Sequence, residues 1–135
     1  MSDKPFFGSN FVGGNWENGF GIRFYKQEDG SMEAQYTFEE RHQGPSMIAH
    51  GGALSAVFDE ALTAAAMYDN GVAFTVQMDI TFKAPVYLNT PVRITSRILK
   101  TEGRKIFLEA QMILADNTVA AFAKSLFIRM QEVER

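Results

Sequence analysis

His50, Gly51 and Gly52 precede a strongly apolar segment, and Asp59 follows the histidine by nine residues. The two glycines predict a turn into a helix, whose first backbone N–H groups lack intrahelical acceptors and present a partial positive charge. Asp59 would lie two turns into that helix among apolar neighbours, where an unpaired charge costs several kcal/mol. A carboxylate in such surroundings can act as a base or a nucleophile. The spacing therefore favours attack on a carbonyl group.

Each of these residues also has a structural interpretation. In an average helix Asp59 would be a surface aspartate, but its apolar neighbours favour a functional role. Gly51 and Gly52 form a tight junction between loop and helix, and glycine also leaves bare N–H groups open to a ligand. For His50 we favour a role in holding its own loop over action as a general base. His42 is expected at the surface or in a loop, without an assigned role.

One long helix, from Gly51 to Tyr68, must position the carboxylate. It is apolar on almost every face, which is typical of a buried helix. Ser55, Asp59 and Thr63 recur every four residues and therefore share one stripe. Ser55 and Thr63 are expected to hydrogen-bond back to helix carbonyls or to line a pocket. Asp69-Asn70-Gly71 offers a left-handed cap at the helix end.

Six strands are expected around this helix. Two short strands precede it and four follow it, at residues 19–25, 31–38, 74–83, 92–100, 105–114 and 119–130. The strict alternation in 74–83 is a strong strand signal and places Thr75 on its polar face. Residues 1–18 are expected to form an irregular lead, residues 27–30 a turn, and residues 39–49 a loop. This order predicts an α+β fold: a long, twisted antiparallel sheet of about five or six strands wrapped around one central helix.

Composition limits the class of protein. The 135 residues suit a single domain, residues 1–135, and the net charge of -3 includes no basic block that would indicate nucleic-acid binding. With no cysteine and two histidines, we expect neither a disulfide nor a metal site. No apolar run reaches the roughly 18 residues of a membrane span, and no signal peptide is evident. A cytoplasmic protein without a membrane partner is therefore expected.

The stretch from Gly44 to Glu60 resembles the signature of the hotdog-fold acyl-CoA thioesterases. It contains Gly44-Pro45, then Ala49-His50-Gly51-Gly52-Ala53-Leu54, Ala56 and Asp59-Glu60. The most similar branch holds the phenylacetate-pathway thioesterases and their mammalian relatives, and the likeness covers roughly residues 40–130, including Thr75 and residues 82–86. The resemblance implies hydrolysis of an acyl thioester to a free acid and coenzyme A. It implies neither a metal nor a separate cofactor, since coenzyme A is part of the substrate.

The resemblance also implies a role for each matching residue. Asp59 falls on the family's catalytic acid, which acts as general base or nucleophile. Gly51 and Gly52 fall on the turn whose backbone N–H groups polarise the thioester carbonyl. His50 falls on the histidine that shapes this loop, and Thr75 on a hydroxyl that helps to place the water.

Further implications concern the substrate and the assembly. Lys83 and Pro85 lie in the matching segment and are expected to contact coenzyme A. In the family the site is shared between two subunits, so a homodimer or homotetramer is implied, with the catalytic aspartate coming from the partner. The aromatic and methionine side chains are expected mainly in the core, and some of Phe58, Met67, Phe74 and Met78 are expected to line an acyl tunnel as well.

Two departures from the family pattern leave alternatives open. Gly44 stands where some branches carry asparagine or glutamine, and Met47 where other relatives carry glycine. Oxyanion stabilisation would then rest on backbone N–H groups, with His42 or Gln43 as helpers. A non-catalytic acyl-CoA or lipid-binding module is therefore the alternative function. A hydratase or dehydratase of acyl thioesters ranks lowest, because that chemistry uses a differently spaced aspartate and histidine.

Overall fold

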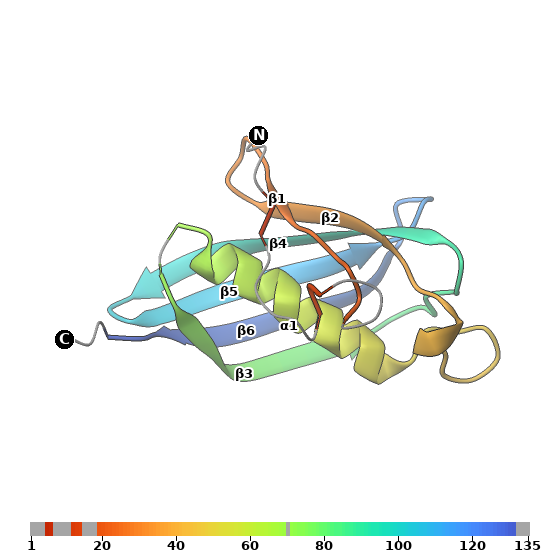
Figure 1. Cartoon of the computed structure of the whole chain (residues 1–135). Coiled ribbons are helices and arrows are strands. Elements are labelled where there is room, and N and C mark those ends of the chain that lie inside the picture. Colours follow the sequence, from red (N-terminus) through yellow and green to blue (C-terminus); the bar gives the residue numbers. More distant parts are fainter. Residues whose placement is uncertain (1–4, 7–11, 15–18, 70, 132–135) are drawn as a thin grey trace.

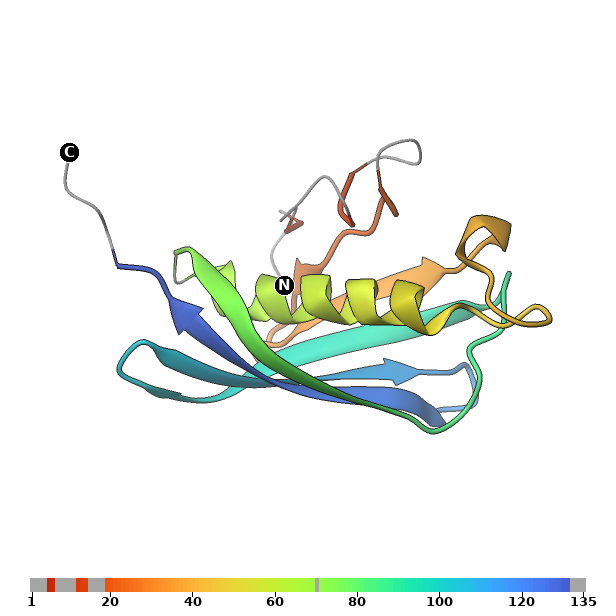
Figure 2. The same ribbon diagram turned by 90° about the horizontal axis from the view of Figure 1, so that it is seen from below.

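A single helix lies across one face of a six-stranded antiparallel sheet (Figure 1). The structure is a computed structural model that describes residues 5–6, 12–14, 19–69 and 71–131. The helix is α1 (Gly51–Met67), and the strands are β1 (Tyr25–Lys26), β2 (Met32–Thr37), β3 (Ala73–Phe82), β4 (Pro91–Glu102), β5 (Lys105–Ile113) and β6 (Val119–Arg129). Their order in the sheet is β1-β2-β4-β5-β6-β3. Figure 2 shows the sheet curving around the helix, so the expected hotdog fold is confirmed.

The helix α1 forms where the apolar pattern predicts it and packs its sheet-facing side into the core. Its largest fully buried side chains are Val57, Phe58 and Leu62. Each such side chain contributes about 1.5–3 kcal/mol by leaving water. The chain turns after the helix at Gly71, whose φ of 78° is the left-handed conformation expected of a cap. No helix in the described ranges is long and apolar enough to cross a membrane.

Five of the six expected strands are confirmed to within two residues at each end, and the first is wrong. Residues 19–25 were expected to form a strand, but β1 covers only Tyr25–Lys26. Gly21 has a φ of 75°, which interrupts the extended backbone. Phe24 makes only an isolated bridge to Phe6. Ile22 and Phe24 are both buried, so the alternation reflects packing against the core.

A β-bulge in β3 changes which of its side chains face the helix. The pairing with β6 shifts between Thr75 and Gln77. Before the shift Thr75 contacts the helix, and after it Met78 and Ile80 pack against the core. A strict alternation would have placed Thr75 and Met78 on opposite faces. Phe74 precedes the shift and is 51% exposed, so it does not belong to the core, and its place in an acyl tunnel stays a prediction.

The loop before the helix contains a short 3₁₀ helix, η1 (Glu40–His42). Its last residue, His42, is only 5% exposed, so the expected surface position is wrong. The imidazole packs against the Phe20 ring at 4.5 Å between ring centroids, with the planes tilted by 35°, and meets Phe38 edge-on at 5.6 Å. These aromatic neighbours exclude water from a residue type that is usually half-exposed.

Candidate active site

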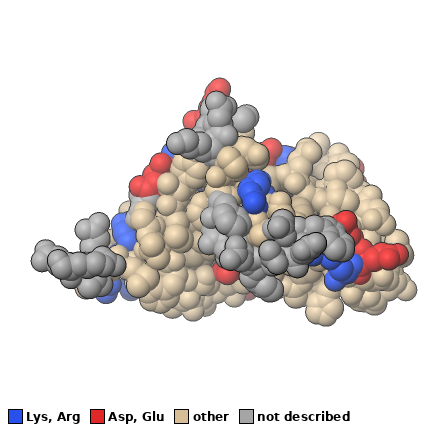
Figure 3. Space-filling model, viewed as in Figure 1, with Lys and Arg blue, Asp and Glu red and all other residues tan. Residues whose placement is uncertain are grey.

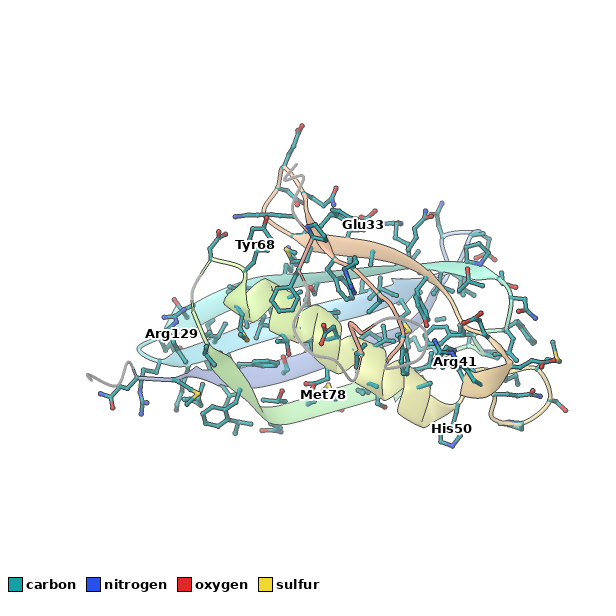
Figure 4. All side chains as sticks on the ribbon, viewed as in Figure 1. Glu33, Arg41, His50, Tyr68, Met78 and Arg129 are labelled. Atoms are coloured by element: carbon teal, nitrogen blue, oxygen red, sulfur yellow. The ribbon has the colours of Figure 1, made fainter. Side chains whose placement is uncertain are left out.

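His50 caps the start of α1. Its Nδ1 accepts a hydrogen bond from the Gly52 N–H at 2.8 Å, and its carbonyl accepts from Leu54 N–H at 3.1 Å. Figure 4 shows His50 at this end of the helix, directed away from the sheet. This is the structural role that the sequence favoured, and a catalytic role stays a prediction. Within the part of the chain that the structure describes, the Gly51 and Ala53 N–H groups donate to no protein acceptor.

Both departures from the family pattern lie in the loop that leads into the helix, where the backbone conformation limits the side chains. A Cβ at Gly44 would lie 3.1 Å from the His50 Cα, so an asparagine or glutamine there would require the backbone at His50 to shift slightly. Met47 has a φ of 64°, the left-handed conformation in which glycine is favoured. Its neighbour Ser46 also has a positive φ, of 40°. The backbone is therefore strained immediately before the candidate site.

The structure places Thr75 beside Asp59, although sixteen residues separate them in the sequence. The Thr75 hydroxyl donates to the Asp59 Oδ1 at 2.7 Å. The carboxylate is half-buried, and its other oxygen is free of any protein donor among the described residues. The neighbouring Ser55 hydroxyl bonds back to the Gly51 carbonyl at 2.7 Å, as expected of a helix serine. Asp59 therefore has one oxygen fixed and one available.

A pocket of about 400 Å³ opens beside Gly51. We name it the Lys83 pocket; it is lined by Pro45, Ile48, Gly51, Leu54 and the segment 82–86, which includes Pro85. Among the described residues that line this pocket Lys83 alone is charged, and its ammonium nitrogen lies 5.5 Å from the centre of the Phe122 ring. Among the described residues, no carboxylate lies within 4.0 Å of the Lys83 ammonium group.

A second pocket, of about 420 Å³, lies on the other side of the helix start. We name it the Phe20 pocket; its lining includes Gly52 and His50 and also Phe20, Arg41, His42, Gln43, Ala53 and Ala56. Arg41 lies at the helix end that carries His50 (Figure 4), and its Nε is 3.6 Å from the Glu39 carboxylate. On the face shown in Figure 3, the charged side chains lie in small separate groups, one of them a basic group near the middle. Sequence reasoning missed this pocket because Phe20 is distant in the chain.

His42 supports one wall of the Phe20 pocket as a neutral imidazole. Its Nδ1 accepts the Glu39 N–H at 3.0 Å, which leaves the proton on Nε2. Burial, followed by the nearby Arg41 charge, lowers the pKa of His42. In the described residues the buried Nε2 has no hydrogen-bond partner. The described residues also contain no cluster of three side chains that could hold a metal ion.

The predicted site residues fall into two groups. Thr75 lies with Asp59, whereas His50, Lys83 and Pro85 lie with the helix start. Asp59 follows Gly51 by eight residues. At a rise of 1.5 Å per residue, about 12 Å of helix separates them. One carbonyl group cannot contact both within a single chain.

Comparison with known proteins identifies similar sequences. A family model described as the Thioesterase superfamily matches residues 47–121. The chain is 30% identical over 108 residues to the acyl-coenzyme A thioesterase THEM4 of Xenopus laevis, covering 79% of this chain and 49% of that protein. It is also 30% identical over 120 residues to the Mus musculus protein of the same name, covering 86% and 52%. The chain thus spans about half the length of these relatives.

Solved structures of other proteins share the fold. The Escherichia coli PaaI protein from the phenylacetic acid degradation operon matches with a TM-score of 0.77 at 16% identity, covering 84% of this chain and 83% of that one. The smu.793 protein of Streptococcus mutans, solved bound to acetyl CoA, matches with a TM-score of 0.76 at 14% identity, covering 84% and 91%. At these identities the likeness concerns the fold alone.

Proposed function

The chain belongs to the thioesterase superfamily, and from this premise we propose that it hydrolyses an acyl-coenzyme A thioester to a free acid and coenzyme A. The names of its relatives support this activity. The observation that carries the proposal is the 2.7 Å hydrogen bond from Thr75 to Asp59, which fixes one carboxylate oxygen and leaves the other available. The proposed reaction uses no metal and no cofactor apart from the substrate's own coenzyme A.

In the proposed mechanism Asp59 acts as a general base. It accepts a proton from a water molecule whose oxygen attacks the carbonyl carbon of the thioester. Collapse of the tetrahedral intermediate breaks the C–S bond, and the leaving thiolate takes the proton from Asp59. Direct attack by Asp59 would instead give a mixed anhydride, which water then cleaves to the same products. A positioned base typically contributes about 10²–10⁴-fold in rate.

The start of α1 stabilises the negative oxygen of the intermediate in this proposal. Gly51 supplies a backbone N–H that has no acceptor among the described residues. The Gly52 N–H donates to His50, so it becomes a second donor only when that side chain turns away. One such donor is worth about 10²–10³-fold in related chemistry.

We further propose that the site is shared between two copies of the chain. Because about 12 Å of helix separates Gly51 from Asp59, the base must come from a second subunit. The strand β3 is an edge of the sheet and offers unpaired backbone groups to another strand. Thr75 lies near the start of β3, whereas Phe82 at its end lies beside Gly51.

Antiparallel pairing of two β3 strands would therefore bring Asp59 of the partner subunit towards Gly51. It would also cover part of Phe82, which is 50% exposed. The resulting unit is a homodimer, which two copies of the dimer can extend to a homotetramer. The cysteine-free composition agrees with action in the reducing cytoplasm.

The test is thiol release from a panel of acyl-CoA substrates by the wild type and by Asp59→Asn. We expect the variant to lose about 10²–10⁴-fold in turnover, because the amide cannot accept the proton. Asp79→Asn, on the opposite face of β3, is the matched control and should retain turnover. Equal melting temperatures would show that both variants fold. Near-native turnover by Asp59→Asn would contradict the mechanism.

A second candidate is a non-catalytic acyl-CoA-binding module. The occupied Gly52 N–H favours it, because one expected oxyanion donor is engaged by His50. Calorimetric binding of acyl-CoA without thiol release would support this candidate, and substantial release would exclude it.

A further inference from the structure

We infer that the buried Nε2–H of His42 donates a hydrogen bond to an uncharged oxygen atom of the bound thioester, which makes His42 a specificity-determining residue of the Phe20 pocket. Such an oxygen can belong to a hydroxyl or oxo group on the acyl chain, or to an amide carbonyl of the coenzyme A arm. The inference rests on the proposed function and adds a polar contact that the proposed reaction steps do not use.

The first support is that this nitrogen is a donor without an acceptor. The Glu39 N–H donates to the His42 Nδ1 at 3.0 Å, so the proton of the neutral ring lies on Nε2. The side chain is buried, with 5% exposed, and within the described part of the chain the Nε2 has no hydrogen-bond partner. Buried polar groups in folded proteins nearly always have a partner. The unpaired donor therefore indicates a ligand atom that binds beside it.

The second support is that the imidazole is held in one orientation. Its ring packs against Phe20 at 4.5 Å, meets Phe38 edge-on at 5.6 Å and lies 5.9 Å from the ring of Tyr36. Its backbone is fixed as well, because the His42 carbonyl accepts the His50 N–H at 2.7 Å. The donor is therefore preorganised, and little further ordering is needed when a ligand binds.

The third support is the place of His42 in the pocket. It lines the Phe20 pocket together with Gly52, which lies at the start of α1. A thioester held at that helix start extends one of its arms towards His42. The Nε2 is out of contact with bulk water, so a hydrogen bond formed there is stronger than one at the surface. Contact requires side chains of the pocket wall to rotate, a change that is common on binding.

The charges around the pocket favour an uncharged oxygen. Arg41 already lies 3.6 Å from the Glu39 carboxylate, and Glu40 adds a second carboxylate in the same short helix. A neutral imidazole gives a buried carboxylate one hydrogen bond but no compensating charge, so that carboxylate would be costly to bury. Hydroxyl, oxo and amide oxygens avoid this cost.

The first experiment observes the Nε2 proton of His42 directly. The chain has two histidines, so ¹⁵N-histidine labelling gives two sets of imidazole signals, and loss of one set in His42→Asn assigns it. The wild type is titrated with coenzyme A, with S-octyl-coenzyme A and with analogues of the latter that carry one hydroxyl along the chain. These thioethers are not hydrolysed, so the result does not depend on turnover. A downfield shift with hydroxylated analogues alone assigns the oxygen to the acyl chain, and a shift with free coenzyme A assigns it to the other arm.

The second experiment compares the matched variants His42→Asn and His42→Gln. The short asparagine amide can accept the Glu39 N–H in place of Nδ1, whereas the longer glutamine amide places an NH₂ donor near the position of Nε2. Calorimetry gives the affinities for the same ligands, and thiol release gives kcat/KM for octanoyl-CoA and its hydroxylated forms. For an acyl oxygen, the wild type should prefer one hydroxylated form by about 10-fold, the value of one hydrogen bond. His42→Asn should lose this preference and His42→Gln should keep most of it.

For an oxygen of the coenzyme A arm, His42→Asn should instead weaken free coenzyme A by about 10-fold and leave the acyl preference unchanged. No shift with any ligand, together with wild-type affinities in both variants, would overturn the inference. Equal losses in both variants for every ligand would also overturn it, because they indicate a purely structural role. Tighter binding of a carboxylate-ended analogue than of the hydroxylated ones would exclude an uncharged oxygen.

The proposed function can fail separately. A wild type that binds the analogues and shows the shift, but releases no thiol, would contradict the hydrolysis and not the contact with His42. If His42→Asn does not fold, the titration of the wild type decides, with the signal assigned through His42→Gln.

Discussion

The hydroxyl of Thr75 fixes the orientation of the proposed base, since it donates to the Asp59 Oδ1 at 2.7 Å. Valine has nearly the same shape as threonine but cannot donate this bond. A hydrogen bond to a charged group is worth about 1.5–3 kcal/mol. Thr75→Val should therefore lower kcat by roughly 10- to 150-fold with a smaller change in KM, measured as thiol release at saturating substrate.

Two other variants test whether this loss comes from the hydrogen bond. Thr75→Ser keeps the hydroxyl and should recover most of the turnover. Thr81→Val makes the same change on the opposite face of β3 and should leave turnover intact. Equal losses in Thr75→Ser and Thr75→Val would show that the methyl group, and not the hydrogen bond, matters.

Tyr36, whose hydroxyl bonds to the Phe20 carbonyl, links stability to pH. Burial is the main cause that raises its pKa from the ordinary value of 10.0 to about 12. The folded state therefore favours the neutral phenol, whose hydroxyl donates to the Phe20 carbonyl. This contribution to stability is fully present below pH 10 and is lost as the pH rises towards 12.

The prediction is a stability difference between the wild type and Tyr36→Phe that shrinks with rising pH. At pH 8 the wild type should be more stable by about 1 kcal/mol, the value of one hydrogen bond. Urea unfolding at several pH values up to 11 measures the free energy of unfolding of both proteins. A difference that stays constant above pH 10 would contradict the assigned pKa.

At the scale of elements, the loop before α1 has a strained backbone at Met47, and a substitution there should relieve the strain. Met47 has a φ of 64° and its side chain is 49% exposed, so little packing compensates. The left-handed conformation costs a non-glycine residue about 1–2 kcal/mol. Glycine avoids this cost, but its greater freedom stabilises the unfolded chain by about 0.5–1 kcal/mol and so offsets part of the gain. Met47→Gly should therefore raise the free energy of unfolding by about 0.5–1 kcal/mol, measured in urea.

Met47→Ala separates strain from the loss of the side chain. Alanine keeps the penalty of the left-handed backbone and removes the methionine side chain, so this variant should be no more stable than the wild type. If the alanine and glycine variants were equally stable, backbone strain at Met47 would not be the cause.

The sequence predicts well those elements that are specified by residues close together in the chain. The apolar run after Gly51 specifies α1, and short connections specify the hairpins from β4 to β6. The bulge after Thr75 could not be predicted, because it depends on how β3 pairs with β6 at the other end of the chain. The strand expected at residues 19–25 failed for the same reason, since alternation reports burial but does not identify a partner strand.

At the scale of the whole molecule, the sequence predicts the site residues better than the space around them. The residues of the motif itself, Gly51 and Asp59, are close in sequence and share one helix. The Phe20 pocket instead joins three segments that are separated in the chain, around Phe20, Arg41 and Ala53. Such a cavity depends on tertiary packing, which no local spacing encodes. The pocket itself therefore had to come from the structure.

The shared site makes a quantitative prediction for the whole assembly. Asp59→Asn and Gly51→Leu should each be nearly inactive, because the first removes the base and the second places a side chain at the helix start. Unfolding the two chains together and refolding them should form mixed dimers. In a mixed dimer, one site combines the Gly51 of the first variant with the Asp59 of the second and is intact, while the other site is doubly defective.

Random pairing makes half of the dimers mixed, and half of their sites are intact, so the mixture should regain about one quarter of the wild-type turnover. Each variant refolded alone is the control and should stay inactive. Sedimentation analysis confirms that dimers have formed in all samples. If the mixture is no more active than each variant refolded alone, although subunits have exchanged completely, then Asp59 and Gly51 of one site belong to the same chain. Because about 12 Å of helix separates these two residues within one chain, they could not both contact one carbonyl. The same result would therefore also contradict the proposed mechanism, in which both act on that carbonyl.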